Sequence, residues 1–306
     1  MTPTAVNTLK RNYRGRFAPS PSGPLHFGSL VAAVGSYLDA KANQGTWLVR
    51  IEDIDTTRVV SGADTDILNT LEAYSLHWDE QVVYQTKRLD LYQDVVNSLT
   101  KQQLVYGCRC SRKQIKALGG IYQGHCKTQQ LDLHTNALRL TQNYATTEFT
   151  DVIQGHIEVN AALAGEDYII KRSDGLFAYQ LVVVVDDMAQ GINRIVRGAD
   201  LIEPTARQIS LFKQLQQPIP EFAHLPLAVA KPGFKLSKQN YAPAICKQNP
   251  KPALLAALAF LGLPTFAELI ELNVEQLLAW GVQNFNLSQV PKVAEIQVSP
   301  AKLREG

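Results

Sequence analysis

The strongest constraint on the fold is the alternation of strand-like and helix-like segments in the first hundred residues. Runs at 15–19 and 46–55 predict strands, and amphipathic runs at 29–43, 62–76 and 87–103 predict helices. Strands and helices that alternate in this way are joined by right-handed crossovers. The sequence therefore predicts an α/β fold built around a mainly parallel sheet.

The middle of the chain breaks this alternation. From Cys108 to about Tyr168 the apolar runs are short and separated by glycine, threonine, asparagine and glutamine, which is typical of an insertion with a small fold of its own. Beyond it the patterns predict strands at 167–172, 176–187, 193–200 and 224–229, a helix at 203–216, and a terminal helical unit at 251–263 and 266–282.

Composition is that of an ordinary globular protein and restricts the possible partners only weakly. Of the 306 residues, 45% are hydrophobic and 19% are charged, and the net charge is +2. Such a charge neither demands nor excludes a nucleic-acid partner. No apolar run is long enough to cross a bilayer, and residues 1–17 lack the apolar core of a signal peptide. We therefore expect a cytoplasmic protein without a membrane partner.

Residues 16–30, RFAPSPSGPLHFGSL, join the first predicted strand to the first helix. The prolines fix the backbone angle φ, while Gly23 and Gly28 remove side chains where a ligand could touch the backbone. His26 directly precedes the helix, whose N-terminal N–H groups attract phosphates. An ordinary strand-to-helix connection with an incidental histidine would look the same, and the stretch matches neither the P-loop nor the G-x-G-x-x-G fingerprint.

A second charged loop follows the last predicted strand. Residues 231–240, KPGFKLSKQN, contain Lys231, Lys235 and Lys238 together with a glycine and a serine. Ammonium groups on a flexible loop could bind a polyphosphate as negative charge develops on it. Taken alone, a lysine-rich loop is more often a solvated surface.

Cysteine spacing predicts a metal site in the insertion. Cys108 and Cys110 form a C-x-C pair, and Cys126 follows at loop distance. In a cytoplasmic protein such thiols are more often metal ligands than disulfides, and this set suits a structural zinc ion. Spacing alone nominates His125 as the fourth ligand, and three unrelated buried thiols are the alternative. Cys246 has no partner in the pattern.

The two loops and three further stretches resemble a known family. PSGPLHFGS and KLSKQ are similar to the two signature sequences of the class I aminoacyl-tRNA synthetases. RFAPSPSG, RIEDID and VRGADLIEPTARQ resemble the glutamyl branch of that family. LFAYQLVVVVDD and the short chain resemble a truncated paralogue of glutamyl-tRNA synthetase. The resemblance extends from about Gly15 to about Leu263.

The resemblance implies an enzyme, a ligase that forms an adenylate. The α-carboxylate of L-glutamate would attack the α-phosphate of ATP without tRNA, pyrophosphate would leave, and Mg²⁺ would accompany the ATP. Such a transfer depends on positioning and charge stabilisation more than on a protein nucleophile. By this resemblance the catalytic residues are His26 and Lys238, and the ATP-binding residues are His26, Gly28, Ser29, Lys235 and Lys238.

Two positions depart from the family pattern. Ser29 stands where a second histidine is usual, and Gln239 stands where the last serine of the lysine loop is usual. The first departure argues against a phosphate clamp made of two imidazoles. The second leaves the lysines intact, so we expect catalysis to persist.

The resemblance also implies a glutamate pocket. Glutamate carries two carboxylates and an ammonium group, so a selective pocket needs arginine and carboxylate side chains. Arg16 and Arg197 would bind carboxylates, Glu52 would bind the ammonium group, and Tyr179 would donate its hydroxyl; a surface ion pair is the alternative for each charged residue. The expected glutamate-binding residues are Arg16, Phe17, Ala18, Pro19, Ser20, Glu52, Tyr179 and Arg197.

In the family a tyrosine at the position of Tyr122 completes the zinc site. The implied ligands of one structural Zn²⁺ are Cys108, Cys110, Tyr122 and Cys126. The expected fold class is α/β, a Rossmann-like parallel sheet with an inserted zinc-bearing α+β subdomain and a small C-terminal helical subdomain. The expected division is 1–107 and 169–245 for the two halves of the catalytic domain, 108–168 for the inserted acceptor-type subdomain and 246–306 for the helical subdomain.

The length of the chain bears on the expected acceptor. Full glutamyl-tRNA synthetases continue into a helical bundle that reads the anticodon, and the stretch from Asn240 to Gly306 leaves no room for one. The resemblance implies that the anticodon loop itself enters the active site. Glutamate would be attached to the queuosine base at the wobble position of tRNA(Asp), by a protein expected to be a monomer.

Three other functions remain as alternatives. A minimal glutamyl-tRNA synthetase would charge the tRNA 3′ end, which the missing anticodon module disfavours. A glutaminyl enzyme is disfavoured because Arg16 and Arg197 would face a neutral amide. A non-catalytic tRNA-binding relic is disfavoured because His26 and Lys238 are both present.

Overall fold

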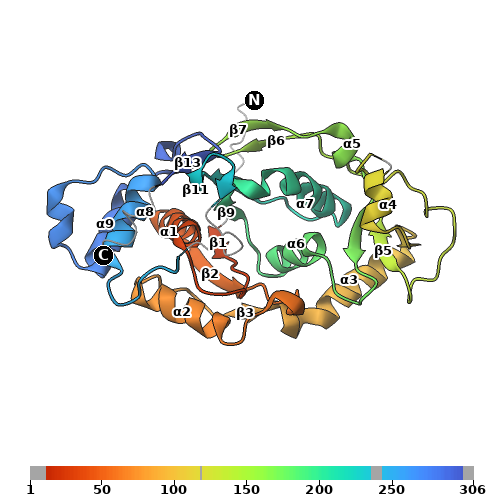
Figure 1. Cartoon of the computed structure of the whole chain (residues 1–306), viewed down its shortest axis with the longest axis horizontal. Helices are drawn as coiled ribbons and strands as arrows, with labels where there is room; N and C mark the ends of the chain where they lie inside the picture. Colours follow the sequence, from red (N-terminus) through yellow and green to blue (C-terminus); the bar gives the residue numbers. More distant parts are fainter. Residues whose placement is uncertain (1–11, 118, 236–242, 299–306) are drawn as a thin grey trace, which may run out of the picture.

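The computed structural model describes residues 12–117, 119–235 and 243–298. The strands are β1 (Arg14–Phe17), β2 (Thr46–Ile51), β3 (Val83–Tyr84), β4 (Val105–Cys108), β5 (Ala137–Leu140), β6 (Glu148–Asp151), β7 (Gly155–Glu158), β8 (Tyr168–Lys171), β9 (Arg194–Gly198), β10 (Glu221–Leu225), β11 (Leu227–Lys231), β12 (Phe234–Lys235) and β13 (Glu295–Gln297) (Figure 1). The helices are α1 (Phe27–Ala42), α2 (Ala63–Ala73), α3 (Leu89–Lys101), α4 (Arg112–Ala117), α5 (Ala161–Ala164), α6 (Tyr179–Ala189), α7 (Ile202–Gln214), α8 (Lys251–Phe260) and α9 (Val274–Asn284).

The centre of the molecule is built from parallel strands. β2 lies between β1 and β3 and pairs with both in parallel, and β9 pairs in parallel with β10. The two sets meet where the N–H of Asn193 donates to the carbonyl oxygen of Arg14 (3.0 Å). The predicted α/β class with parallel strand pairing is confirmed. The carboxyl ends of β1, β2 and β9 carry Phe17, Ile51 and Gly198, each beside a residue expected in the site.

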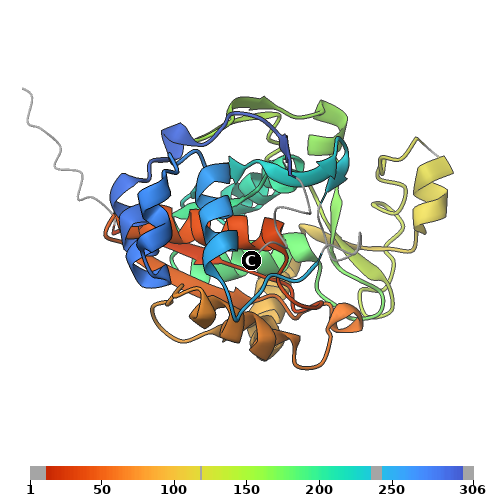
Figure 2. The ribbon, with the colours of Figure 1, turned by 60° about the vertical axis from the view of Figure 1, so that its left-hand side comes forward.

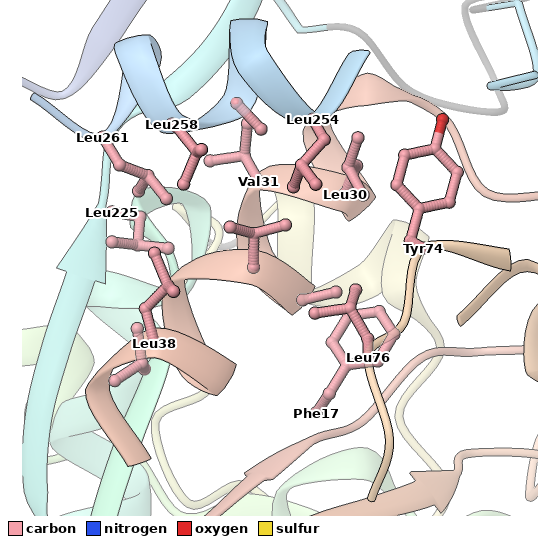
Figure 3. Packing of buried hydrophobic residues seen from close by; sticks show 14 of the residues in the cluster. Phe17, Leu30, Val31, Leu38, Tyr74, Leu76, Leu225, Leu254, Leu258 and Leu261 are labelled. Carbon is pink, nitrogen blue, oxygen red and sulfur yellow. The ribbon is translucent and has the colours of Figure 1, made fainter. Parts of the chain in front are cut away.

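Helix α1 joins the parallel strands to the C-terminal helices. Leu30, Val31 and Leu38 of α1 are buried, and they belong to one cluster with Leu254 and Leu258 of α8 (Figure 3). A second cluster on the other side gathers α3, α6, α7 and β8. A core on each side of the parallel strands is what holds their carboxyl ends in one place.

Residues 176–187, expected to form a strand, instead form most of helix α6. Every side chain from Leu181 to Asp187 is buried, because α6 packs between α3, α7 and β8. A helix that is buried all round loses its polar stripe, and its run of four valines then has the pattern of a buried strand. Tertiary burial overrode the β-propensity of valine, and this expectation was wrong.

Residues 224–229, expected to form one strand, divide into β10 and β11 at Pro226. Proline has no N–H to donate to a ladder, so it favours a break between strands. β10 stays on β9, whereas β11 pairs with β12 and in parallel with β13. Pro226, which separates the two strands, therefore lies at the carboxyl end of β10.

The segment between β4 and β8 forms antiparallel structure. β5 pairs with β4 and β8, and β6 pairs with β7, in both cases antiparallel. In two views α4 and β5 lie at the end of the molecule opposite to α8 and α9, whereas β6 and β7 lie along its upper edge nearer the middle, where β6 packs on β10 (Figures 1 and 2). Among the described residues, no helix combines the length and the apolar character that crossing a membrane requires.

Candidate active site and cysteine cluster

A cavity of about 680 Å³ opens at the carboxyl ends of β1, β2 and β9. Its lining comes from the loop after β1, the start of α1, the start of α6 and the turn between β10 and β11. Eleven residues expected in the site line it together: Arg16, Phe17, Ala18, Pro19, Ser20, His26, Gly28, Ser29, Glu52, Tyr179 and Arg197. Lys235 ends β12, and Lys238 lies outside the described residues.

The loop after β1 is held by its own carbonyl groups. The oxygens of Pro19 and Pro21 accept from the N–H groups of Glu52 and Val60, both at 2.9 Å. Gly23 has φ +132°, in the left-handed region that glycine tolerates better than other residues. The prolines and Gly23 therefore hold the loop against the carboxyl end of β2, with Glu52 beside the loop.

His26 caps the N-terminus of α1. Its Nδ1 accepts from the backbone N–H of Ser29 (3.2 Å), so this nitrogen carries no proton. The other ring nitrogen, Nε2, lies 3.1 Å from the hydroxyl of Ser29 and can donate to it. Ser29 stands where the family has a second imidazole, and it contacts both ring nitrogens of His26. When Nε2 donates to Ser29, the hydroxyl of Ser29 can donate its own proton at the helix N-terminus, which suits binding of a phosphate oxygen.

Arg16 belongs to a buried network of charges. Asp187 of α6 binds Arg16 at Nε (3.0 Å) and Arg50 at Nη1 (2.8 Å), and Arg50 also pairs with Glu52 (3.2 Å). Burial alone would raise the pKa of Asp187, but the two guanidinium groups outweigh it and hold the pKa low. Burial raises the pKa of Glu52 against the opposing effect of Arg50. A ligand cation beside Glu52 would oppose this effect of burial and favour the ionised carboxylate.

Arg197 is buried, and no carboxylate among the described residues forms an ion pair with it. Its Nε donates to Nε2 of His224 (3.1 Å), and its Nη2 donates to Thr205 (2.6 Å) and Gln208 (2.8 Å). In the described part of the chain, Nη1 has no hydrogen-bond partner. Burial lowers the pKa of this arginine, but a guanidinium group stays charged at neutral pH. A buried guanidinium group whose Nη1 has no acceptor among the described residues can bind an anion.

Tyr179 opens α6 at the same cavity. Burial raises the pKa of its phenol, so the hydroxyl keeps its proton and can donate. The cavity therefore has arginine donors for an anion, a carboxylate acceptor for a cation in Glu52, and a neutral donor in the hydroxyl of Tyr179. These are the groups that an amino acid with an acidic side chain requires.

The three insertion cysteines meet in space. The sulfur atoms of Cys108, Cys110 and Cys126 all lie within 4.8 Å of one another, and His125 is not part of this group. Thiolates on one tetrahedral zinc lie ~3.8 Å apart, and Cys110 and Cys126 are 3.5 Å apart. The distances between the sulfur atoms therefore fit one zinc ion.

Tyr122 lies against this cysteine cluster. Its hydroxyl oxygen accepts from the N–H of Cys126 (2.8 Å), and its ring lies under the guanidinium of Arg139 (3.6 Å). Burial and the neighbouring thiols raise the pKa of Cys110 to about 12, and burial raises that of Tyr122 to about 12. A dication relieves this crowding of acidic groups because it binds their deprotonated forms.

Sequence reasoning missed the residues that hold the cavity arginines. The sequence contains a hint of Asp187, because this carboxylate follows the apolar run VVVV. It was expected at the end of a strand, whereas it lies on a buried helix. No sequence pattern indicates Asp151 or His224. They belong to β6 and β10, and Oδ2 of Asp151 lies 2.6 Å from Nδ1 of His224 only because the fold brings these strands together. Arg58 and Asp200 also line the cavity and were not expected there.

Comparison with known proteins gives consistent matches. The family model "tRNA synthetases class I (E and Q), catalytic domain" matches residues 12–272. Proteins named glutamyl-Q tRNA(Asp) synthetase are similar over nearly the whole chain. That of Colwellia psychrerythraea is 53% identical over 297 residues, covering 94% of each chain. That of Escherichia coli strain K12 is 54% identical over 282 residues, covering 92% of each chain.

A solved structure shows the same fold at lower identity. The glutamate tRNA ligase of Elizabethkingia meningosepticum, in complex with its amino acid, superposes with a TM-score of 0.79 at 23% identity. The match covers 96% of this chain and 68% of that one. At this identity the likeness concerns the fold alone.

Proposed function

Since the chain belongs to the family of class I tRNA synthetases for glutamate and glutamine, we propose that it activates L-glutamate with ATP and transfers it to queuosine in tRNA(Asp). Activation gives glutamyl-adenylate without tRNA. The acceptor is the queuosine base at the wobble position, in agreement with relatives named for Q tRNA(Asp). Expected partners are ATP with Mg²⁺, L-glutamate and that tRNA.

The observation that supports this proposal most is the combination of groups in one cavity. Arg197 supplies a buried cation whose Nη1 has no partner among the described residues, and Glu52 supplies an acceptor for an ammonium group. A neutral glutamine side chain would leave the charge of Arg197 without an anion. The pocket therefore favours the acid over the amide.

In the activation step an oxygen of the glutamate α-carboxylate attacks the α-phosphorus of ATP. The bond from that phosphorus to the bridging oxygen breaks, and pyrophosphate leaves with the electron pair. His26 and Ser29, at the N-terminus of α1, bind phosphate oxygens. Lys235 and Lys238 of the lysine loop stabilise the charge on the leaving pyrophosphate. Mg²⁺, when bound with ATP, screens the phosphate charges.

In the transfer step a hydroxyl of the acceptor attacks the carbonyl carbon of glutamyl-adenylate. The bond to the AMP oxygen breaks, AMP leaves, and the hydroxyl proton is released. Arg16, Glu52, Tyr179 and Arg197 keep the glutamyl group oriented, while Phe17 to Ser20 form the wall beside it.

The insertion binds one structural zinc through Cys108, Cys110, Tyr122 and Cys126. The three sulfur atoms are close enough for one ion, and the phenol of Tyr122 is held beside them by the N–H of Cys126. Zinc would cross-link β4 to the loop that follows it. In this proposal residues 108–168 form a subdomain between the catalytic halves 1–107 and 169–245, with 246–306 as a helical subdomain.

The test has two parts. Exchange of labelled pyrophosphate into ATP, measured without tRNA, should require L-glutamate and should not occur with L-glutamine. Arg197→Gln should lower kcat/KM for glutamate by ~100-fold or more, because it removes a buried charged donor. Arg172→Gln, at an exposed arginine, is the control and should keep wild-type exchange.

The acceptor is then tested with three RNAs: tRNA(Asp) containing queuosine, the same tRNA without queuosine, and tRNA(Glu). Only the first should accept labelled glutamate. Equal charging of the queuosine-free tRNA would overturn the proposed acceptor, and charging of tRNA(Glu) at its 3′ end would identify a minimal glutamyl-tRNA synthetase. Absence of exchange would reject the activation step itself.

A further inference from the structure

Two buried residues behind Arg197 have no part in the steps described so far. Asp151 ends β6, and His224 lies in β10, directly opposite Arg197 in the β9–β10 register. Both side chains are fully buried. Nδ1 of His224 donates to Oδ2 of Asp151 at 2.6 Å, and Nε2 of His224 accepts from Nε of Arg197 at 3.1 Å.

The carboxylate of Asp151 is itself fixed in orientation. Its Oδ1 accepts from three backbone N–H groups, those of Ile153 (2.9 Å), Gln154 (2.8 Å) and His224 (3.2 Å). Only Oδ2 is directed to the imidazole. The proton of neutral His224 is therefore held on Nδ1, which leaves a lone pair on Nε2.

That lone pair decides how Arg197 lies. An arginine nitrogen always donates, so a protonated Nε2 would place two donors face to face. The hydroxyl of Thr205 accepts from the other branch of the guanidinium, Nη2 (2.6 Å), donates to the oxygen of Leu201 (2.7 Å) and lies 3.2 Å from Nε2 of His224, so the imidazole is the acceptor for Nε. With Nε and Nη2 both held, Nη1 is the donor that remains for a substrate.

We propose that Asp151 and His224 are positioning residues that orient Arg197 to bind a carboxylate of the substrate. The inference deepens the proposed function and rests on it, because the carboxylate is that of glutamate. Neither residue lines the cavity, so they act through Arg197 and do not touch the substrate. Their contribution should appear in the KM for glutamate and not in that for ATP.

The pair also predicts a dependence on pH. The charged and titratable groups that influence His224 are Asp151 of β6, Arg197 of β9 and Asp200, which follows β9. Burial lowers the pKa of His224 below 6.5, and Arg197 acts in the same direction against Asp151. His224 is neutral at pH 7, and its protonation on acidification removes the acceptor for Arg197. The KM for glutamate should therefore rise as the pH falls below 6.5.

Three variants separate positioning from packing. Asp151→Asn keeps the Oδ1 acceptor but presents an amide N–H to Nδ1, which moves the imidazole proton to Nε2. His224→Phe keeps a ring beside Phe222 and removes the acceptor. His224→Gln keeps an acceptor at the position of Nε2.

The measurement is glutamate-dependent pyrophosphate exchange by the full-length protein, with the KM determined for glutamate and for ATP. Asp151→Asn and His224→Phe should raise the KM for glutamate by ~10-fold or more, since each removes a hydrogen bond to a charged group. The KM for ATP should change by less than ~2-fold, which is the usual limit for a site that is not coupled. His224→Gln should restore most of the glutamate affinity and should lose the rise in KM at low pH.

The matched control is His156→Gln, at an exposed histidine of β7, which should have the wild-type KM values and pH profile. If Asp151→Asn keeps the wild-type KM for glutamate, or if it raises both KM values equally, the inference is wrong. If Asp151→Asn does not fold, the comparison of His224→Phe with His224→Gln is the deciding measurement, since equal KM values for glutamate in these two variants contradict the inference. Failure of the wild-type protein to catalyse exchange would reject the proposed function instead.

Discussion

At the scale of single residues, the two cavity arginines differ in what neutralises their charge. Arg16 donates twice to Asp187, at 3.0 Å from Nε and 3.3 Å from Nη2, so its charge is already paired. Arg197 has only neutral partners among the described residues, and its charge remains for a ligand. We infer that Arg197 contributes more of the attraction for a carboxylate, whereas Arg16 contributes mainly shape and a hydrogen bond.

Asp187 is the residue on which the buried charge network depends. Asp187→Asn removes the carboxylate shared by Arg16 and Arg50, and two buried guanidinium groups then lose a partner. Removing one partner of a buried ion pair costs ~3–5 kcal/mol. We expect a loss of that size in the free energy of unfolding, measured by urea denaturation, together with weaker binding of glutamate.

Asp174→Asn provides the control for Asp187. Asp174 pairs with Arg172 at the surface, where each side chain is 40% exposed or more. An exposed pair of this kind contributes less than ~1 kcal/mol. Equal destabilisation by the two variants would mean that the network around Asp187 adds nothing beyond an ordinary ion pair.

At the scale of elements, the loop after β1 shows how local sequence builds a site. His26 is the N-cap of α1 and also lines the cavity. The residue that begins the helix therefore also fixes the position of the imidazole in the site. Ser29, one turn into α1, completes the group through its N–H and hydroxyl. This part of the site could be predicted, because its residues are neighbours in the chain.

A variant of the cysteine cluster can test whether the structure between β4 and β5 depends on a bound metal. Metal analysis of the purified protein should give about one zinc per chain, and Cys110→Ser should lose it, because three ligands hold zinc more weakly than four. Limited proteolysis should then cut the variant between β4 and β5, with cleavage elsewhere unchanged. Cys246→Ser, at an exposed cysteine outside the cluster, should keep zinc and resistance. A Cys110→Ser protein with full zinc content would refute the site.

At the scale of the whole molecule, the packing of α1 on α8 and α9 ties the C-terminal helices to the parallel strands. Gly35 of α1 allows a close approach on both sides, because a Cβ there would lie 2.7 Å from Leu225 of β10 and 3.3 Å from Leu261, which directly follows α8. Gly281 of α9 is close to Leu38 and Leu258 in the same way, at 3.1 and 3.2 Å from a built Cβ. The helices therefore share one core with the strands that carry the site.

This shared core predicts a single unfolding transition. Leu258→Ala, in the last turn of α8, should cost ~2–5 kcal/mol as a buried leucine truncation. Circular dichroism and tryptophan fluorescence should report the same shifted midpoint, because α8 and the parallel strands unfold together. Leu89→Ala, at an exposed position of α3, should change stability by less than ~0.5 kcal/mol. Two separate transitions in the Leu258→Ala protein would contradict a shared core.

The sequence by itself determined the parts that depend on neighbours in the chain. The α/β class followed from the order of strand-like and helix-like runs, and the loop at 16–30 and the C-x-C pair were visible as motifs. The family resemblance added Glu52, Tyr179 and Arg197, which then proved to line one cavity with Arg16. Periodicity failed at α6, where burial on all sides removed the polar stripe on which the prediction depends.

Only the tertiary structure decided which side chains hold the site in shape. Asp187 was expected at a strand end and proved to be a buried residue of α6 bound to Arg16. Asp151 and His224 lie 73 positions apart and meet because β6 and β10 are packed together. A contact of this kind has no local sequence pattern, because its two residues are distant in the chain. Such contacts form only when the core is packed, so a pattern along the sequence does not predict them.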